Sequence, residues 1–241
     1  HPKLNYRDFD RQSLLIQEQS FTGPILKNAD VNGDGLEDVF IGGAAGQSAS
    51  LFIQNGKGGF DLKKTNAFQA DAISEDRDAV FIDVNKDGFL DLFVASGGYH
   101  QFEPNDKKLA DRLYMNNGKG DFLKSNQTFE ASSSASLASN DINKDGFEDI
   151  FIGGGVVPGR YPEVSPSYIL INNAQGKLTK KSISAFTDLG LVKDAVWADL
   201  NRDGNKELLV VGEWMGVKIF ENNKGEFKDV SSTYFNDTYT G

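Results

Sequence analysis

Short apolar runs recur along the chain, each bounded by glycine and polar residues. Four of them follow aspartate-rich segments, at 39–41, 92–94, 150–152 and 208–211. These runs are rich in β-branched residues and too short for a buried helix, so they predict buried strands. Four further stretches precede the same segments, at 23–29, 78–82, 134–140 and 194–198. They predict a strand on the other side of each aspartate-rich segment.

A second hairpin follows in every copy. Its strands flank a turn rich in Asn and Gly, in the segments SLFIQNGKGGF (50–60), RLYMNNGKGDF (112–122), YILINNAQGKL (168–178) and VKIFENNKGEF (217–227). Asn and Gly tolerate the positive φ that tight hairpin turns require. One repeat unit therefore contains four strands. An aspartate-rich loop joins the first two, a variable loop joins the second and third, and a tight turn joins the last two. Four short strands in roughly 55 residues is the size of a propeller blade.

The aspartate-rich segments are copies of one motif, DxNxDGxxD, with Glu at the last position of the fourth copy. The copies begin at Asp30, Asp83, Asp141 and Asp199, at intervals of 53, 58 and 58 residues. A repeat of this period indicates a propeller or a solenoid, and four antiparallel strands per period favour the propeller. We therefore predict an all-β fold, a β-propeller or a propeller segment made of four-stranded antiparallel blades.

The repeats divide one domain, 1–241, into four blades. We place the blades at about 24–75, 76–130, 131–188 and 189–235. Residues 1–23 form an N-terminal strand or extension, in which 11–19 could be a strand of a preceding blade. We expect a fragment of a longer propeller, and a closed propeller of four or five blades is the alternative.

The start of each aspartate-rich loop resembles an EF-hand calcium loop, but the remainder does not. An EF-hand needs a bidentate acid at position 12 and helices on both sides. Position 12 is apolar in all four copies, and the acid lies at position 9. Oxygens from positions 1, 3, 5, 7 and 9 of a hairpin loop would still suit Ca²⁺, with glycine at position 6 for the bend. The alternative is an Asx turn without metal, which Asp, Asn and Gly also favour.

The distribution of charge supports a metal. The 241-residue chain has 35 acidic and 25 basic residues and a net charge of −10. Twelve acids lie at the predicted ligand positions, so the other 23 acids face 25 bases. The excess negative charge therefore lies in the loops, where close carboxylates repel one another.

The net negative charge argues against nucleic acid as a partner, and the absence of cysteine excludes disulfides and thiol chemistry. No apolar stretch reaches the ~18–20 residues of a transmembrane segment.

In these loops and their flanking strands the sequence resembles the FG-GAP/VCBS repeat family, whose calcium-bearing blades also build integrin α-chain propellers. The resemblance covers about residues 20–230. Residues 23–46 and 191–227 look most like blades of bacterial FG-GAP proteins associated with ASPIC/UnbV domains. The resemblance implies a secreted or cell-surface location, with any signal or anchor outside this sequence. It also implies other domains of a longer parent chain.

The resemblance further implies Ca²⁺ as a structural cofactor at about four sites. The ligands it implies are Asp30, Asn32, Asp34, Asp38 and the Leu36 carbonyl; Asp83, Asn85, Asp87, Asp91 and the Phe89 carbonyl; Asp141, Asn143, Asp145, Asp149 and the Phe147 carbonyl; and Asp199, Asn201, Asp203, Glu207 and the Asn205 carbonyl. The fourth set departs from the family pattern. Glu207 is one methylene longer than Asp, and Asn205 replaces an apolar residue.

The loops between second and third strands lie on the opposite rim from the aspartate-rich loops. They vary most in length, at 42–50, 96–111, 153–167 and 212–216. Repeat proteins often bind partners through such insertions. We therefore predict a protein or glycan ligand on this rim. Its candidate contacts are aromatic and basic residues, Tyr99, His100, Phe102, Arg160, Tyr161 and Trp214. Alternatively, these residues only pack on their own loops.

The predicted function is that of a calcium-stabilised binding or interaction module, without catalysis. No catalytic constellation is evident: the only histidines are His1 and His100, and the acidic segment 74–83 is expected to be a surface connection. The 18 phenylalanines are expected to fill the interfaces between blades. Two alternatives remain: an enzyme propeller like that of some polysaccharide lyases, and a pure scaffold within a larger secreted protein.

Overall fold

The computed structural model describes residues 7–20, 23–173, 175–187 and 189–236. Sixteen strands form four antiparallel sheets within these residues. The first sheet contains β1 (Leu26–Ala29), β2 (Asp38–Ile41), β3 (Ser50–Gln54) and β4 (Phe60–Lys63). The second contains β5 (Glu75–Ile82), β6 (Asp91–Gly97), β7 (Arg112–Asn116) and β8 (Phe122–Lys124). The third contains β9 (Ser134–Asn140), β10 (Asp149–Gly154), β11 (Tyr168–Asn172) and β12 (Leu178–Lys181). The fourth contains β13 (Leu191–Ala198), β14 (Glu207–Glu213), β15 (Lys218–Asn223) and β16 (Glu226–Asp229).

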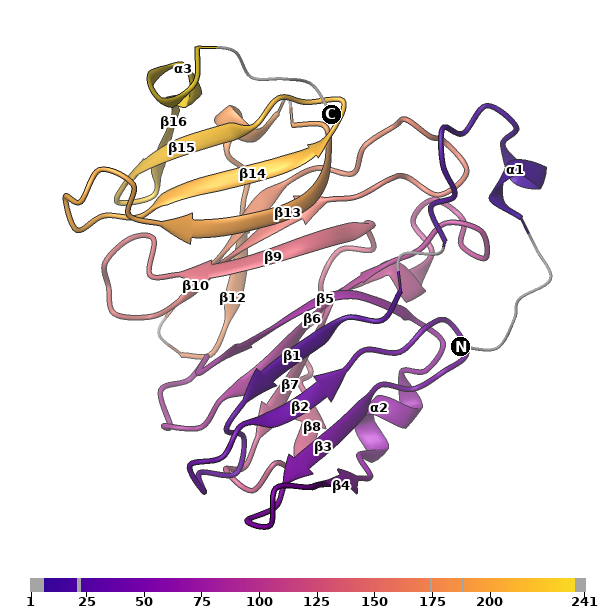
Figure 1. Cartoon of the computed structure of the whole chain (residues 1–241), viewed down its shortest axis with the longest axis vertical. Coiled ribbons are helices and arrows are strands. Elements are labelled where there is room, and N and C mark those ends of the chain that lie inside the picture. Colours follow the sequence, from indigo (N-terminus) through magenta and orange to yellow (C-terminus); the bar gives the residue numbers. More distant parts are fainter. Residues whose placement is uncertain (1–6, 21–22, 174, 188, 237–241) are drawn as a thin grey trace.

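Each sheet keeps its four strands in chain order, as the sequence predicts for a propeller blade. The blades follow one another, so that β5 lies beside β9 and β9 beside β13. The first and last blades lie at opposite ends of this row (Figure 1). The prediction of an all-β propeller or propeller segment is confirmed. Helical turns are short: α1 (Asp8–Arg11), α2 (Asn66–Ala70), α3 (Ser231–Tyr234), η1 (Lys107–Leu109) and η2 (Ser184–Phe186).

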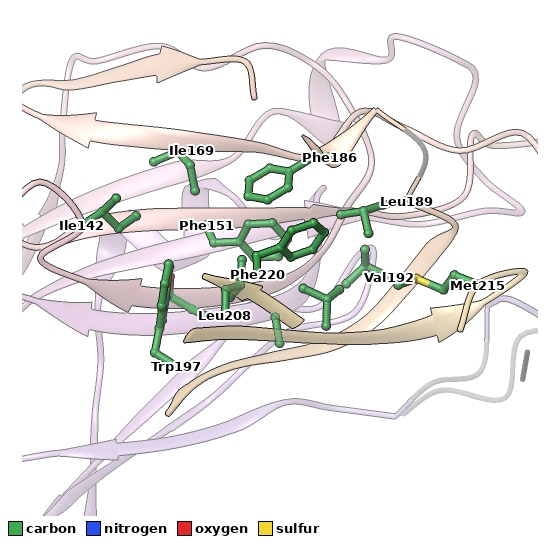
Figure 2. Close-up of a cluster of buried hydrophobic side chains, with 13 residues drawn as sticks. Ile142, Phe151, Ile169, Phe186, Leu189, Val192, Trp197, Leu208, Met215 and Phe220 are labelled. Carbon is green, nitrogen blue, oxygen red and sulfur yellow. The ribbon is translucent and has the colours of Figure 1, made fainter. Parts of the chain in front are cut away.

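Three hydrophobic cores lie between consecutive blades. The core between the third and fourth blades packs Phe151 of β10 against Phe186 of η2, with ring centroids 5.3 Å apart, and Phe186 against Phe220 of β15, at 5.0 Å (Figure 2). Phe40 and Phe93 are buried in the corresponding cores of the earlier blades. Phenylalanine therefore fills the blade interfaces, as expected. Truncating one such ring costs about 3–5 kcal/mol, so neighbouring blades stabilise each other.

The two middle blades are covered on both faces. Every residue of β6 and of β10 is buried, because each sheet has a neighbour on either side. In the first blade, β2 alternates between buried and half-buried residues, and Leu62 of β4 is exposed. The second strand of a blade is therefore buried along its whole length only where both faces of its sheet are packed.

The structure differs from two expectations. The acidic segment 74–83 is not a surface connection: it forms β5, the first strand of the second blade, and Asp76 and Asp78 are buried there. Both carboxylates are paired, Asp76 with Arg112 and Asp78 with Lys27, which is how acids are accommodated in an inner strand. Residues 7–20 contain α1 and no strand. None of the described helices is long and apolar enough to cross a membrane.

Candidate functional site

The four aspartate loops, 30–38, 83–91, 141–149 and 199–207, share one backbone geometry. Position 6 is glycine in every copy, with φ between 83° and 87°. Position 4 is also left-handed, although it is glycine only in the first loop. In the others it is Lys86, Lys144 and Arg202, with φ of 56°, 62° and 63°. A basic residue with positive φ is uncommon, so three of the loops hold a conformation that their sequence does not favour.

Side chains at positions 1, 3 and 5 hold this conformation. In the first loop, Asp30 accepts hydrogen bonds from the amides of Asp34 and Gly35, at 3.2 and 2.8 Å. Asn32 accepts from the Asp34 amide and donates to the Asp34 carboxylate, both at 3.0 Å. Asp34 accepts from the Leu36 amide at 2.8 Å. The other three loops repeat these five bonds.

The position-9 acids are buried, at 1% exposure or less, whereas the rest of each loop is largely exposed. Asp149 accepts hydrogen bonds from Ile142 N in its own loop, at 3.1 Å, and from Asn172 N in the third strand, at 2.8 Å. Asp38 and Asp91 make the equivalent bonds. The position-9 carboxylate thus links the loop to two strands of its blade.

Burial, together with the negative charges of Asp87 and Asp83, raises the pKa of Asp91 to about 6, although hydrogen bonds from two backbone amides oppose the shift. Asp149 behaves in the same way, with Asp145 and Asp141 as its acidic neighbours and a pKa of about 6. The carboxylates of one loop are therefore close enough to repel one another. A cation among them would remove that repulsion.

The fourth loop differs where the sequence departs from the pattern. Glu207 accepts from Leu200 N at 2.8 Å, as the other position-9 acids do from their loops. Its second oxygen accepts from the Asn201 side chain at 3.4 Å rather than from a third-strand amide. The longer side chain therefore turns back into its own loop.

The donor set suits a hard cation. Each loop offers three carboxylates, one amide oxygen and a position-7 carbonyl, and no His or Cys, which are preferences of Ca²⁺ rather than of zinc or copper. Among the described residues, no three acidic, His or Cys side chains are gathered as in a formed metal shell. The carboxylates instead accept hydrogen bonds from the loop backbone. The residues fit calcium in their chemistry and order, and binding would require them to turn inward.

Asparagines at the end of third strands connect neighbouring blades. Asn116 of the second blade donates to Val31 O in the first loop, at 2.8 Å. Asn172 donates to Val84 O at 2.8 Å, and Asn222 to Ile142 O at 2.9 Å. Each aspartate loop before the last is thus bonded to the next blade through its position-2 carbonyl. The sequence signal was the doubled Asn in the second hairpin, which we had interpreted only as turn chemistry.

On the opposite rim, three of the candidate ligand contacts are buried. Tyr99, Phe102 and Tyr161 are at most 6% exposed. His100 is half-buried, with its ring 3.5 Å from Asp8. Arg160 is exposed and pairs with Glu163 at 3.5 Å. The structure therefore leaves few of the predicted contacts accessible, and their role in binding stays a prediction.

Trp214 is the exposed aromatic residue among these candidates, at 55%. Its backbone has a φ of 60°, a strained conformation for a bulky residue. Its indole N–H donates to the Tyr161 hydroxyl at 3.1 Å, and the two ring centroids are 6.3 Å apart. That hydroxyl in turn donates to Glu213 at 3.3 Å. Trp214 thus presents an aromatic surface beside an acid.

An N-terminal clasp, residues 7–20, covers the buried aromatic residues. The Arg11 guanidinium donates to the carbonyls of Tyr99, His100 and Phe102. Gln12 bonds both the Tyr161 backbone and the Tyr99 hydroxyl. The clasp therefore ties the long loops of the second and third blades together. Sequence analysis missed this role, because contacts across about 90–150 positions leave no local pattern.

Comparison with known proteins agrees with this architecture. Three overlapping stretches, 30–94, 83–152 and 141–210, match the FG-GAP-like repeat, and together they span most of the chain. The chain belongs to the FG-GAP-like repeat family. Each FG-GAP match begins at one aspartate loop and ends in the strand that directly follows the next loop, so the loops mark the repeat.

Two longer known proteins are similar to this FG-GAP chain. Integrin alpha-V of Gallus gallus is 27% identical over an alignment of 161 residues, and the match covers 57% of this chain and 15% of the integrin. The solved structure of an Agrocybe aegerita lectin that recognises non-reducing terminal N-acetylglucosamine superposes with a TM-score of 0.53. It is 19% identical, and the match covers 83% of this chain and 49% of the lectin. The lectin thus shows a shared fold, and the chain spans less than half the length of either protein.

Proposed function

We propose that this FG-GAP chain is a calcium-stabilised binding module that acts outside the cell or on its surface. The fourfold repetition of one loop scaffold carries the proposal. Each copy places the same oxygen donors on one rim and buries its position-9 acid. The similarity to integrin alpha-V supports the location and a role in interaction.

Calcium would be held by the four sets of side chains and position-7 carbonyls named above. When bound, it supplies two positive charges that offset most of the charge of the three carboxylates, and it fixes the turn. Two features of the chain itself shape the site. The left-handed glycine at position 6 bends the loop, and the position-9 carboxylate joins the loop to the blade. Because the metal binds only the folded loop, its binding free energy adds to the stability of the fold.

Calcium binding is tested by isothermal titration of chelator-treated protein with CaCl₂. We expect about four equivalents, of which the fourth loop's is the weakest because of Glu207. Asp34→Ala should lower the stoichiometry by one. The matched control is Asp61→Ala, an exposed acid of β4 outside the loops, which should leave it unchanged. Zero stoichiometry would overturn calcium as the cofactor, and the loops would then be metal-free Asx turns.

A ligand, glycan or protein, would bind the opposite rim, where Trp214 offers an exposed aromatic face. Screening on a glycan array and by cross-linking on cell surfaces should yield a ligand whose binding Trp214→Ala weakens by at least about tenfold, or ~1.4 kcal/mol. The control is Phe60→Ala, an exposed aromatic residue of β4. No ligand at all would favour a scaffold. Release of cleaved product from a carbohydrate digest would favour the enzyme.

A further inference from the structure

A cavity of about 280 Å³ opens on the opposite rim, where the first strands of the blades begin. In a propeller the blades surround a central channel, so we call it the axial cavity. All four blades line it where their first strands begin, and these strands then run toward the aspartate loops. The clasp contributes Gln19 to one side. The cavity is thus the place where all four repeats and the non-repeated segment meet.

Four equivalent positions face this cavity. Pro24, Arg77, Ala135 and Lys193 line it, and each lies six residues before the first aspartate of its loop. In the last three blades this residue is a β-bulge: the pairing register skips Arg77 between Asp76 and Asp78, Ala135 between Ser134 and Ser136, and Lys193 between Val192 and Asp194. A bulge re-aims a side chain and leaves it out of the strand ladder.

The bulges keep their position while their side chains differ in size and charge. A residue that served only to close the propeller would be expected to repeat, as the phenylalanines between blades do. A position used for recognition instead keeps its backbone conformation while its side chain varies. The bulge residues therefore differ from the packing residues, because their side chains change from one repeat to the next.

The cavity combines balanced polar groups with apolar walls. Arg77 pairs with Glu75 at 3.1 Å, and Lys193 pairs with Glu213 at 2.8 Å. Both bases also approach Gln19, at 3.4 Å to its carbonyl and 3.5 Å to its side-chain oxygen. An anion would meet no unpaired positive charge at these two bases. Hydroxyl groups can accept from Arg77 and Lys193 and donate to the side-chain oxygen of Gln19, which also lines the cavity. The apolar lining comes from Ile25, Val156, Leu191 and Val192.

We propose that the axial cavity binds one neutral sugar unit of pyranose size, with its hydroxyls on Arg77 and Lys193 and its C–H face on the apolar wall. The volume lies just below the about 300–1,000 Å³ of pockets for drug-sized ligands, which suits a single ring. This inference rests on the proposed binding function, and it adds a sugar site in the axial cavity to the aromatic face that Trp214 offers on the same rim.

The test is a titration of the calcium-loaded chain with methyl glycosides of glucose, galactose, mannose and N-acetylglucosamine, and with methyl glucuronide, followed by ligand-observed NMR. At least one neutral sugar should bind. Ala135→Leu, which fills the cavity, and Lys193→Met should each weaken it by about tenfold. The matched control is Lys228→Met, an exposed lysine of β16 in the same blade as Lys193, which should bind like the parent chain. Melting temperatures of all variants establish that they are folded.

Three outcomes would overturn the inference: no binding of any glycoside, binding unaffected by both cavity variants, or tighter binding of glucuronide than of glucoside. The proposed function fails separately. Two results would refute the axial site but leave the binding module in place. One is that Trp214→Ala abolishes binding of an array ligand while the cavity variants do not. The other is that an array ligand exists but no monosaccharide binds. If no ligand of any kind is found, both are wrong.

Discussion

The two rims of the propeller are stabilised in different ways. On the aspartate-loop rim, hydrogen bonds join residues two to seven positions apart, and the same pattern occurs in all four blades. On the opposite rim, Arg11 and Gln12 of the clasp bond to residues of the second and third blades that are far away in sequence. The bonds of the first rim repeat from blade to blade, and most of them are local, apart from the asparagine bonds to the next blade. The bonds of the other rim are unique and long-range.

This contrast separates stability from recognition. A metal bound at one rim would strengthen each blade by itself, because its ligands come from a single loop. The clasp instead joins several blades through one segment, and it borders the axial cavity. Changes on the first rim should therefore respond to calcium, and changes on the second should not.

The largest effect is expected from a buried position-9 acid. Asp149→Ala leaves two amide groups, of Ile142 and Asn172, without their charged acceptor. Hydrogen bonds to charged groups contribute about 1.5–3 kcal/mol each, so we expect a loss of about 3 kcal/mol or more. The measurement is urea unfolding at pH 7.5 in chelator, with Asp61→Ala as a control that should stay within about 0.5 kcal/mol. A loss as small as the control's would mean that the acid is not a structural link.

A smaller effect is expected from the clasp. Arg11→Ala removes the shared donor to three carbonyls on the opposite rim and should cost about 2 kcal/mol. The loss should be equal with and without calcium, and amide exchange at 96–103 should accelerate. Arg7→Ala, at an exposed position of the same segment, is the matched control. A loss that appears only without calcium would show that the two rims are coupled, contrary to the comparison.

The last effect concerns the slope of stability with pH rather than a loss of stability at one pH. Burial raises the pKa of Asp111 to about 7, although Ser96, Ser134 and Arg112 oppose the shift. An acid whose pKa is raised on folding contributes stability below its unfolded pKa of about 3.9, and this stability is lost as the pH rises through about 7. Asp111→Asn should therefore make the decline of unfolding free energy between pH 5 and 7 shallower, by up to about 1.4 kcal/mol per pH unit. Denaturant melts in chelator at several pH values measure it, and parallel profiles for the two proteins would contradict it.

The repetitive half of the molecule could be predicted from the sequence. The spacing of the aspartate motifs, the apolar runs and the Asn-Gly turns gave the blades and the position of every loop, because each depends on neighbouring residues. Segment 74–83 was misinterpreted because acids in an inner strand are stable only through partners such as Arg112 and Lys27, which lie elsewhere in the chain. The bulges at Arg77 and Lys193 likewise depend on pairing that no local pattern shows.

The central claim is that calcium stabilises the fold through the aspartate loops. Differential scanning calorimetry of the parent chain in millimolar CaCl₂ and in chelator tests it most directly, with MgCl₂ as the control because Mg²⁺ requires a smaller octahedral shell. Each site occupied at 100 times its Kd adds about 2.7 kcal/mol. We therefore predict that calcium raises the Tm by more than about 10 °C and that magnesium raises it far less. Equal melting temperatures in calcium and in chelator would contradict the account.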